Sequence, residues 1–253
     1  MNTAAFPRIA VVIPAYNEAS TIADIVRRAG HHTDRVIVVN DGSSDETARV
    51  LEKLPVTLLN NTQNLGKGKS LLCGARLALE QGATAVITLD GDGQHRPEDI
   101  PLLLEMAAAN PDTIIIAARL HNRNCAPPLR RFANSFADFW ISWAAGYRIR
   151  DSQSGFRLYP AAIFQQCPTE SNNFVFESEI LIDAARQGMY SKGVAIDTVY
   201  HQNSRRSHYQ PARDTWAIVR MVAGKLLNRG LYPLGLLRSL GIWSHPQTRQ
   251  SSI

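Results

Sequence analysis

Two carboxylates, Asp90 and Asp92, flank a single glycine immediately after the largely apolar run Ala85–Leu89. Gln94 follows two residues later, and Pro97 can open a helix beyond it. Carboxylate and amide oxygens are hard ligands of the kind that Mg²⁺ or Mn²⁺ prefers, usually with substrate phosphates completing the shell. Asp-Gly is also a common turn dipeptide, so the pattern alone is more typical of a turn than of a metal site.

Polar clusters also follow two earlier strand-like runs. Pro14-Ala15-Tyr16-Asn17-Glu18 comes after Ile9–Ile13, and Asn40-Asp41-Gly42-Ser43-Ser44-Asp45 ends the run Arg35–Asn40. Asn17 or Ser20 could cap the first predicted helix and Ser43 or Ser44 the second, because such side chains accept hydrogen bonds from unpaired helix amides. Capping accounts for neither Tyr16 nor Asp41, which are therefore candidate ligand-binding residues.

A third segment, Asn64-Leu65-Gly66-Lys67-Gly68-Lys69-Ser70, precedes a predicted helix. Glycines allow close backbone approach, and the free amides of a helix start attract phosphate, to which Lys67 and Lys69 add charge. The spacing is not that of a Walker A loop. Solvated lysines on a turn are the alternative explanation.

The elements that must position these clusters alternate regularly from Arg8 to Ala118. The apolar runs predict strands at Ile9–Ile13, Arg35–Asn40, Val56–Leu59, Ala85–Leu89 and Thr113–Ala118, and helices at about Glu18–Gly30, Ser44–Leu54, Lys69–Gln81 and Pro97–Ala109. Such alternation predicts an α/β fold with a mostly parallel sheet covered by helices on both faces. Ligands of these sheets collect at the carboxyl ends of the strands, which is where the polar clusters lie.

Beyond Ala118 the alternation stops. Arginines flank Pro127-Pro128, and Phe132–Tyr147 is predicted to be a half-buried amphipathic helix. The segment 151–160 is typical of a functional loop entering a strand, and the glycine of its Ser-Gly step indicates close backbone approach. A helix at about Phe176–Gln187, which carries Glu177 and Glu179, and a strand at Val194–Val199 complete this part.

The C-terminal region is basic and apolar. Arg205 and Arg206 lie in a polar segment, and residues 216–243 mix aromatic, aliphatic and basic side chains. This pattern is typical of a helix at a membrane interface or of a helix packed on the domain with a basic outer face; packing is favoured for 215–228 and the interface for 231–243. We expect a catalytic domain at 1–210, an amphipathic helical arm at 211–243 and a disordered tail at 244–253.

Composition narrows the function further. The 253 residues carry a net charge of +5, which favours an anionic ligand or surface, but the chain has no motif of a known nucleic-acid-binding module. No signal peptide and no apolar run near the bilayer-spanning length are evident, so membrane contact is expected to be peripheral. Cys73, Cys125 and Cys167 have no metal-ligand spacing and are typical of structural thiols in a reducing cytosol.

Together these motifs, with Asp151–Arg157, resemble in order and interval the family 2 glycosyltransferases of GT-A fold. The resemblance spans about Arg8 to Tyr200. Gln94-His95 and Ser154-Gly155-Phe156-Arg157 are similar to the branch that contains dolichyl- and polyprenyl-phosphate mannose or glucose synthases. No role is assigned to His95.

The resemblance implies roles for the donor side of the reaction. It implies nucleotide binding by Pro14, Tyr16, Asn17, Glu18, Asp41, Lys67 and Asp90, and a divalent Mg²⁺ or Mn²⁺ held by Asp90, Asp92 and Gln94. The leaving group would be a nucleoside diphosphate, whose developing charge a metal stabilises. A single displacement would invert the anomeric centre, with Asp92 counted among the catalytic residues.

The resemblance and acid-base chemistry together suggest the acceptor. A phosphomonoester is already anionic at neutral pH and requires cations, whereas a hydroxyl acceptor requires a carboxylate base. The resemblance places Arg119, Arg131 and Ser135 at an acceptor phosphate, and Ser154, Arg205 and Arg206 are further acceptor-binding candidates. The prediction is a polyprenyl phosphate acceptor, and Arg119 and Arg131 are then counted as catalytic.

Several departures from the branch pattern bear on the acceptor. The acidic motif has glycines at its middle positions, Gln153 replaces a common threonine, and the basic segment ends in Ser207-His208. A lipid or glycolipid hydroxyl with Glu177 or Glu179 as catalytic base therefore stays open. More distant alternatives are a metal-dependent nucleotidyltransferase and a non-catalytic sugar-nucleotide-binding module. The expected location is cytoplasmic, on the inner membrane surface, without a nucleic-acid partner.

Overall fold

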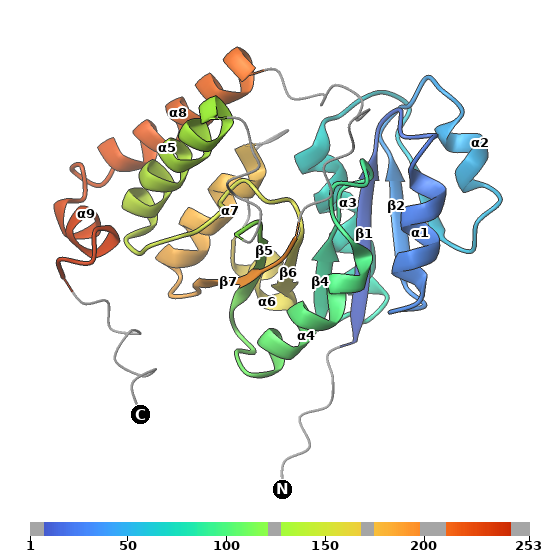
Figure 1. Ribbon diagram of the computed structural model, residues 1–253, viewed down its shortest axis with the longest axis horizontal. Coiled ribbons are helices and arrows are strands. Elements are labelled where there is room, and N and C mark those ends of the chain that lie inside the picture. The colour runs from blue at the N-terminus through green and yellow to red at the C-terminus, as the bar shows by residue number, and fades with distance from the viewer. Residues whose placement is uncertain (1–7, 121–127, 168–174, 198–210, 244–253) are drawn as a thin grey trace, which may run out of the picture.

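The computed structural model describes residues 8–120, 128–167, 175–197 and 211–243, and a seven-stranded sheet forms its centre. The strand order is β3-β2-β1-β4-β6-β5-β7 (Figure 1). The strands are β1 (Ile9–Ala15), β2 (Val36–Asn40), β3 (Thr57–Asn60), β4 (Ala85–Thr88), β5 (Ile114–Ala118), β6 (Arg157–Pro160) and β7 (Ser191–Ala195). Only β6 runs antiparallel to its described neighbours, β4 and β5. The predicted mostly parallel α/β sheet is therefore confirmed.

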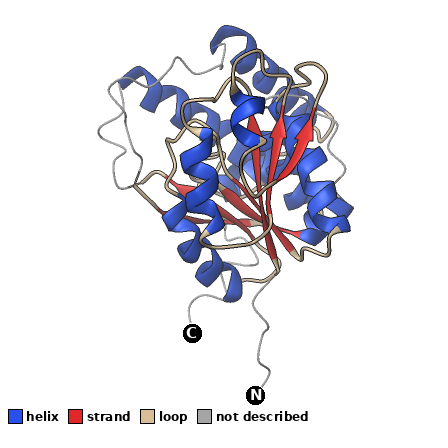
Figure 2. Ribbon diagram, turned by 90° about the vertical axis from the view of Figure 1, so that its right-hand side faces the viewer, coloured by secondary structure: helices blue, strands red, loops and turns tan. Residues whose placement is uncertain are grey.

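Helices cover both faces of this sheet (Figure 2). They are α1 (Ile22–Gly30), α2 (Thr47–Leu51), α3 (Lys67–Glu80), α4 (Ile100–Ala108), α5 (Pro128–Ala145), α6 (Ala161–Gln166), α7 (Val175–Arg186), α8 (Pro211–Leu227) and α9 (Pro233–Ser239), with the 3₁₀ turn η1 (Pro97–Asp99) before α4. Along β1, Val11 packs into the core beneath α1 and α4, whereas Val12 packs into the core beneath α3. Burial on both faces explains why the central strands are continuous apolar runs.

The register of the strands aligns the predicted ligand-binding turns. Ala15 of β1 pairs with Asn40 of β2, which pairs with Asn60 of β3, and Val12 pairs with Thr88 of β4. The turns after these strands therefore leave the sheet at one edge, as the sequence predicted.

Several predicted boundaries differ from the observed ones by a few residues; α2 spans Thr47–Leu51 instead of about Ser44–Leu54, and α5 spans Pro128–Ala145 instead of Phe132–Tyr147. Two further differences have a clear physical reason. Helix α1 begins at Ile22 instead of about Glu18, because residues 17–21 form turns that bond to the segment after β2. Strand β7 begins at Ser191 instead of Val194, with positions 198–199 of the predicted strand outside the described residues. It lies at the edge of the sheet, where Lys192 and Gly193 are exposed, so its sequence has little apolar alternation.

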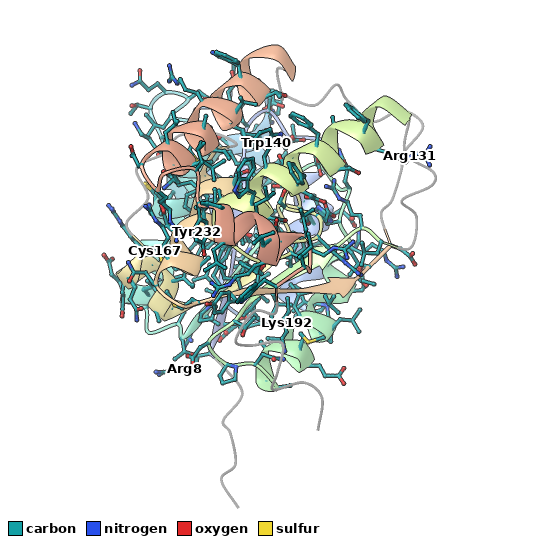
Figure 3. The ribbon with its side chains drawn as sticks, turned by 90° about the vertical axis from the view of Figure 1, so that its left-hand side faces the viewer. Arg8, Arg131, Trp140, Cys167, Lys192 and Tyr232 are labelled. Carbon is teal, nitrogen blue, oxygen red and sulfur yellow. The ribbon has the colours of Figure 1, made fainter. Side chains whose placement is uncertain are left out.

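Helices α5, α8 and α9 form a layer on one side of the molecule (Figure 3). Helix α8 packs inward through Ile218, Val222 and Leu226, as the packing alternative predicted for 215–228. Trp143 Nε1 of α5 donates to the carbonyl of Leu231 (3.0 Å) just before α9. No helix among the described residues is long and apolar enough to cross a bilayer. The proposed tail, 244–253, lies outside the described residues.

Candidate active site

The turns after β1 and β2 are bonded to each other. Asn17 donates its amide N–H to Ser43 Oγ (2.9 Å), and Asn17 Oδ1 accepts from the backbone of Ser44 (2.8 Å) and Asp45 (3.2 Å). Asn17 has a φ of 57°, a conformation that asparagine tolerates better than most residues. The capping role considered for Asn17, Ser43 and Ser44 is wrong, because α1 and α2 begin after these turns without a side-chain cap. These side chains join the two turns instead.

Asp41 holds the segment that leads to Lys67. Its buried Oδ1 accepts from Asn61 Nδ2 (2.8 Å) and from the N–H of Leu65 (2.9 Å), and its Oδ2 accepts from the N–H of Gly66 (2.9 Å). These three bonds give Asp41 a positioning role for the glycine-rich loop. Direct contact between Asp41 and a nucleotide stays a prediction.

Lys67 lies between two carboxylates at the sheet edge. Its Nζ is 2.6 Å from Asp90 Oδ1 and 2.8 Å from Glu177 Oε1. Burial opposes the charge of the ammonium, but the two carboxylates outweigh burial and raise the pKa of Lys67. The N-terminal turn of α3, the end of β4 and the N-terminal turn of α7 therefore meet at one cation.

The loop before β6 closes over this ion pair. A Cβ on Gly155 would lie 2.5 Å from Asp90 Oδ2 and 2.7 Å from Lys67 Nζ, so a larger residue would displace one of them. The carbonyl of Gly155 accepts from Thr88 Oγ1 (2.8 Å), which fixes the loop to the end of β4. The close backbone approach predicted for this glycine is confirmed.

The acidic turn also packs against the segment after β1. Thr21 Oγ1 donates to the carbonyl of Gly91 (2.6 Å). A Cβ on Gly91 would lie 3.4 Å from both Glu18 Cγ and the carbonyl of Pro14. The structure thus brings Pro14 and Glu18 next to the turn that carries the two aspartates, with Tyr16 half-buried between them in the sequence.

Asp92 and Gln94 continue this turn. Asp92 Oδ1 accepts from the N–H of Gln94 (3.0 Å), and burial together with the neighbouring Asp90 carboxylate raises the pKa of Asp92. Two mutually repelling carboxylates beside an amide form a hard-oxygen donor set that fits Mg²⁺ or Mn²⁺. Within the described chain, no three His, Cys, Asp or Glu side chains form a group that could hold a metal ion. A cation at this turn would share its shell with oxygens of a bound diphosphate.

His95 is buried behind the acidic turn. Its ring lies 5.6 Å from that of Phe156, and its Nδ1 has no hydrogen-bond partner in the part of the chain that the structure describes. Burial lowers the pKa of His95 to about 4, although the charge of Asp90 opposes this effect. The residue is therefore a neutral imidazole packed between the acidic turn and the loop before β6.

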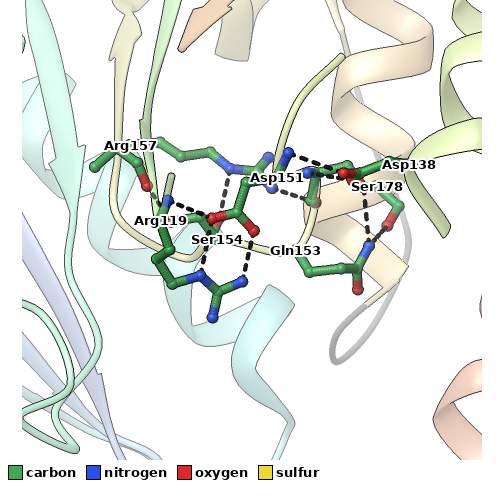
Figure 4. A network of polar contacts seen from close by, with 9 residues as sticks. Arg119, Asp138, Asp151, Gln153, Ser154, Arg157 and Ser178 are labelled. Atoms are coloured by element: carbon green, nitrogen blue, oxygen red, sulfur yellow. Dashed lines mark hydrogen bonds and ion pairs between the residues drawn. The ribbon is translucent and has the colours of Figure 1, made fainter. Parts of the chain in front are cut away.

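Arg119 binds the start of the 151–156 loop. Its Nε and Nη2 donate to the two carboxylate oxygens of Asp151 (2.8 and 2.6 Å), and its backbone N–H donates to Oδ2 (2.8 Å) (Figure 4). Burial opposes ionisation of Asp151, but Arg119 outweighs it and lowers the pKa of that carboxyl. Asp138 of α5 accepts from the N–H of Asp151 (3.1 Å) and from Ser152 Oγ (2.7 Å). The loop is thereby fixed to β5 and to α5.

Arg157 is a residue of this corner that sequence reasoning named only as part of a motif. Its fully buried guanidinium donates to the carbonyls of Ser152 (2.8 Å) and Ser154 (2.7 Å) (Figure 4). It also donates to the carbonyl of Glu177 (2.6 Å) and to Tyr159 Oη (3.2 Å). It therefore joins the loop to the helix turn that carries Glu177. An arginine at the start of a buried strand was the signal, because such a residue must have internal partners.

The remaining predicted residues lie elsewhere. Ser154 Oγ is buried and donates to the carbonyl of Ala117 (2.7 Å), which indicates a loop-positioning role. Glu179 Oε1 lies 3.0 Å from Lys225 Nζ at the contact between α7 and α8, separate from the Lys67 ion pair. Ser135 Oγ donates to the carbonyl of Arg131 (2.9 Å) on the exposed first turns of α5. Arg205 and Arg206 lie outside the described residues.

The fold and this corner define a GT-A glycosyltransferase, with the acidic turn and glycine-rich loop at the carboxyl edge of the sheet. The family model for glycosyl transferase family 2 matches residues 10–169, and the chain belongs to this family. The resemblance stated from the sequence is therefore confirmed, and the protein is an enzyme of this class.

Named relatives include lipid-phosphate glycosyltransferases. The chain is 29% identical over 220 residues to the UDP-N-acetylglucosamine–dolichyl-phosphate N-acetylglucosaminyltransferase of Methanococcus voltae, covering 78% of this chain and 87% of that protein. It is 28% identical over 200 residues to the polyprenol monophosphomannose synthase of Mycolicibacterium smegmatis, covering 72% of this chain and 73% of that protein.

Solved structures show the same fold. Glucosyl-3-phosphoglycerate synthase from Mycobacterium tuberculosis, in complex with Mn²⁺, UDP and glucosyl-3-phosphoglycerate, aligns with a TM-score of 0.65. The alignment covers 88% of this chain and 80% of that chain at 17% identity.

Proposed function

We propose that this chain transfers one sugar from a UDP- or GDP-sugar to a polyprenyl phosphate, with inversion at the anomeric carbon. Family membership establishes glycosyl transfer and removes the nucleotidyltransferase alternative. The names of the Methanococcus and Mycolicibacterium relatives support a lipid-phosphate acceptor.

The proposal rests on one observation: both candidate bases, Glu177 and Glu179, are already held in ion pairs with lysines. A hydroxyl acceptor must lose a proton as it attacks, so it requires a carboxylate that is available to accept one. Glu177 is held 2.8 Å from Lys67 Nζ, and Glu179 is held 3.0 Å from Lys225 Nζ. A phosphate monoester, with a second pKa of about 6, is already an anionic nucleophile at neutral pH. The arrangement of the described residues therefore favours a phosphate over a hydroxyl.

On the donor side, Asp90, Asp92 and Gln94 would hold a divalent cation. When bound, this cation supplies positive charge that stabilises the nucleoside diphosphate leaving group. The complexes of glucosyl-3-phosphoglycerate synthase with Mn²⁺ or Mg²⁺ and UDP support this assignment as relatives in fold. Lys67 and the bonded turns around Asn17 and Asp41 keep the corner in place before the nucleotide arrives.

On the acceptor side, Arg131 and Ser135 lie one helical turn apart at the start of α5. Guanidinium groups match phosphate geometry, so this turn is proposed to bind the acceptor phosphate. Arg119 acts from the neighbouring loop, where its pair with Asp151 orients the guanidinium. The proposed location is the cytoplasmic membrane surface.

A donor and acceptor screen tests the proposal. UDP- and GDP-sugars are paired with a short-chain polyprenyl phosphate and with membrane extracts, and products are identified by mass spectrometry. We expect a glycosyl-phosphate product that requires Mg²⁺ or Mn²⁺ and disappears in Asp92→Ala. A product formed only on a lipid hydroxyl would replace this proposal with the alternative in which Glu177 acts as base.

A further inference from the structure

A continuous row of aromatic rings runs along α5, with its phenylalanines exposed and Trp140 and Trp143 partly buried against the core. Phe132, Phe136, Phe139, Trp140 and Trp143 recur at helical spacing, and the ring centroids of successive neighbours lie 5.1 to 6.3 Å apart. Phe132 is 68% exposed, and Phe136 and Phe139 are also exposed. The sequence predicted this helix as merely half-buried. The three exposed phenylalanine rings leave an apolar surface in contact with water.

Helices α8 and α9 extend this surface. Trp216, Val219 and Leu227 form an exposed stripe on α8, with Trp216 66% exposed. Leu234, Leu237 and Leu240 are exposed on or beside α9, and Leu240 is 53% exposed. We call the aromatic row of α5 and these two stripes the apolar face. Figure 3 shows the three helices on the same side of the molecule, with Trp140 among them.

Tyr232 fixes α9 beside α5. A Cβ on Gly146 would lie 2.6 Å from Tyr232 Oη, so the ring packs directly on the residue that follows α5. The guanidinium carbon of Arg229 lies 3.5 Å from the centroid of the Tyr232 ring, which adds a cation–π contact. The carbonyl of Tyr232 accepts from Trp143 Nε1 (3.2 Å). The apolar face is therefore held as one unit in the described structure.

The arginines of the 215–243 segment give the apolar face a positive border. From Thr215 to Trp243 the sequence holds Arg220, Lys225, Arg229 and Arg238 and no acidic residue. Lys225 is directed inward, where Glu179 and Asp183 of α7 balance its charge, so the border consists of the three arginines. In the described side chains of α5 the single acid, Asp138, is bonded inward to the 151–152 backbone. An apolar surface with a positive border matches the acyl region and the anionic headgroups of a bilayer. Like charges would oppose pairing of this face with a second copy of itself.

We propose that the apolar face docks on an anionic lipid bilayer, with the aromatic row of α5 at the acyl boundary. This inference rests on the proposed function in one respect: the same helix carries Arg131 and Ser135, the proposed binders of the acceptor phosphate. Docking through α5 would place this turn at headgroup level, where the phosphate of a bilayer-anchored acceptor lies. The location of the face thus explains how a catalytic corner at a sheet edge meets a membrane-bound substrate.

Tryptophan fluorescence tests the docking directly, because all four tryptophans of the chain, Trp140, Trp143, Trp216 and Trp243, lie on or next to the apolar face. The full chain is mixed with acceptor-free vesicles of phosphatidylcholine, with or without phosphatidylglycerol. We expect a blue shift of the emission, quenching by acyl-brominated lipids, and tighter binding to vesicles that contain phosphatidylglycerol.

Matched variants locate the contact. The double changes Phe136→Ser/Phe139→Ser and Leu237→Ser/Leu240→Ser are each expected to weaken vesicle binding about tenfold. Leu102→Ser on α4 is the control, because Leu102 is also exposed (41%) but lies on the helix layer of the other core. Thermal unfolding of each variant shows whether the fold is kept. If either double variant fails to fold, quenching of the unaltered chain still decides the proposal.

Unquenched tryptophans in the unaltered chain would overturn the proposal, as would equal vesicle binding by the folded double variants and Leu102→Ser. Concentration-dependent dimerisation that the double variants abolish, without quenching, would assign the face to a second copy. The outcome is separate from the proposed function. Vesicle binding without transfer to polyprenyl phosphate would refute the proposed reaction and support the docking face. Transfer to a short-chain acceptor without vesicle binding would support the reaction and refute the docking face.

Discussion

The turns that meet around Lys67, Asp90 and Glu177, here called the donor corner, and the apolar face are held by different interactions. At the donor corner, short polar bonds fix every turn, such as the contact of Lys67 Nζ with Asp90 Oδ1 at 2.6 Å. On the apolar face, ring packing and buried aliphatic stripes fix the helices while their outer sides stay exposed. Under the proposed function, this difference makes the donor side a preorganised site for one charged ligand and the acceptor side a surface suited to a fluid bilayer.

The largest effect is expected from removing a proposed ligand of the divalent cation at the donor corner. Asp92→Ala is expected to lower kcat about 10³-fold, because a lost ligand for the leaving-group cation weakens stabilisation of the developing charge. Initial rates with saturating Mn²⁺ measure this, with the exposed Asp24→Ala as control. Near-normal turnover of Asp92→Ala would remove Asp92 from the metal site.

The next prediction concerns Arg157, which joins the 152–154 loop to the turn of α7 that carries Glu177. Arg157→Gln is expected to destabilise the fold by about 3 kcal/mol, since three buried carbonyls lose a charged donor. Thermal and denaturant unfolding measure the change, and Arg150→Gln on the exposed surface is the matched control. If Arg157→Gln unfolds like the unaltered chain, the loop does not depend on this guanidinium. Partial recovery of kcat in Arg157→Lys would support a positioning role beyond stability.

A smaller effect is expected on the acceptor side. Arg131→Ala should raise the acceptor KM about tenfold while hydrolysis of the donor persists, because one guanidinium contact to phosphate is lost. Steady-state kinetics with varied acceptor measure the split between KM and kcat. Arg148→Ala, at an exposed position, serves as control. An unchanged acceptor KM would move the phosphate away from α5.

The smallest effect is expected at the exposed ion pair between Arg28 of α1 and Glu98 of η1, which follows the acidic turn. Hydrogen bonds from Arg28 lower the pKa of Glu98 to about 2, which ties α1 to η1. A depressed carboxyl pKa stabilises the fold above the unfolded value of about 4.3, and this contribution is lost as the pH falls towards 2. Glu98→Gln should therefore cost about 0.5 kcal/mol at pH 7 and nothing near pH 2. A cost that is the same at both pH values would contradict the ion-pair explanation.

Local patterns in the sequence predicted the mostly parallel sheet and the meeting of the polar turns at its edge. Alternating apolar runs predict which segments are strands and which are helices, and polar residues that follow parallel strands meet at one edge by topology alone. Gly155 was predicted to allow close approach, and its backbone lies against Asp90 and Lys67. The turn contacts of Asn17 were missed because a cap and a bond between two turns use the same residue types.

The contacts around Arg157 and Glu177 and the exposure of the α5 rings were harder to predict, because they depend on tertiary structure. The burial of Arg157 and the pairing of Glu177 with Lys67 join segments far apart in the sequence. The exposure of the α5 rings depends on which face α8 and α9 leave uncovered. The sequence pattern of an amphipathic helix gives the apolar stripe without saying whether the protein or a lipid covers it.

The most direct test of the central claim compares a short-chain polyprenyl phosphate with the corresponding alcohol under identical donor and Mn²⁺ concentrations. Glycosylated products are quantified by mass spectrometry over a range of pH values. The account predicts transfer to the phosphate, with no product on the alcohol, because both Glu177 and Glu179 are engaged in ion pairs. Efficient glycosylation of the alcohol, without transfer to the phosphate, would contradict it.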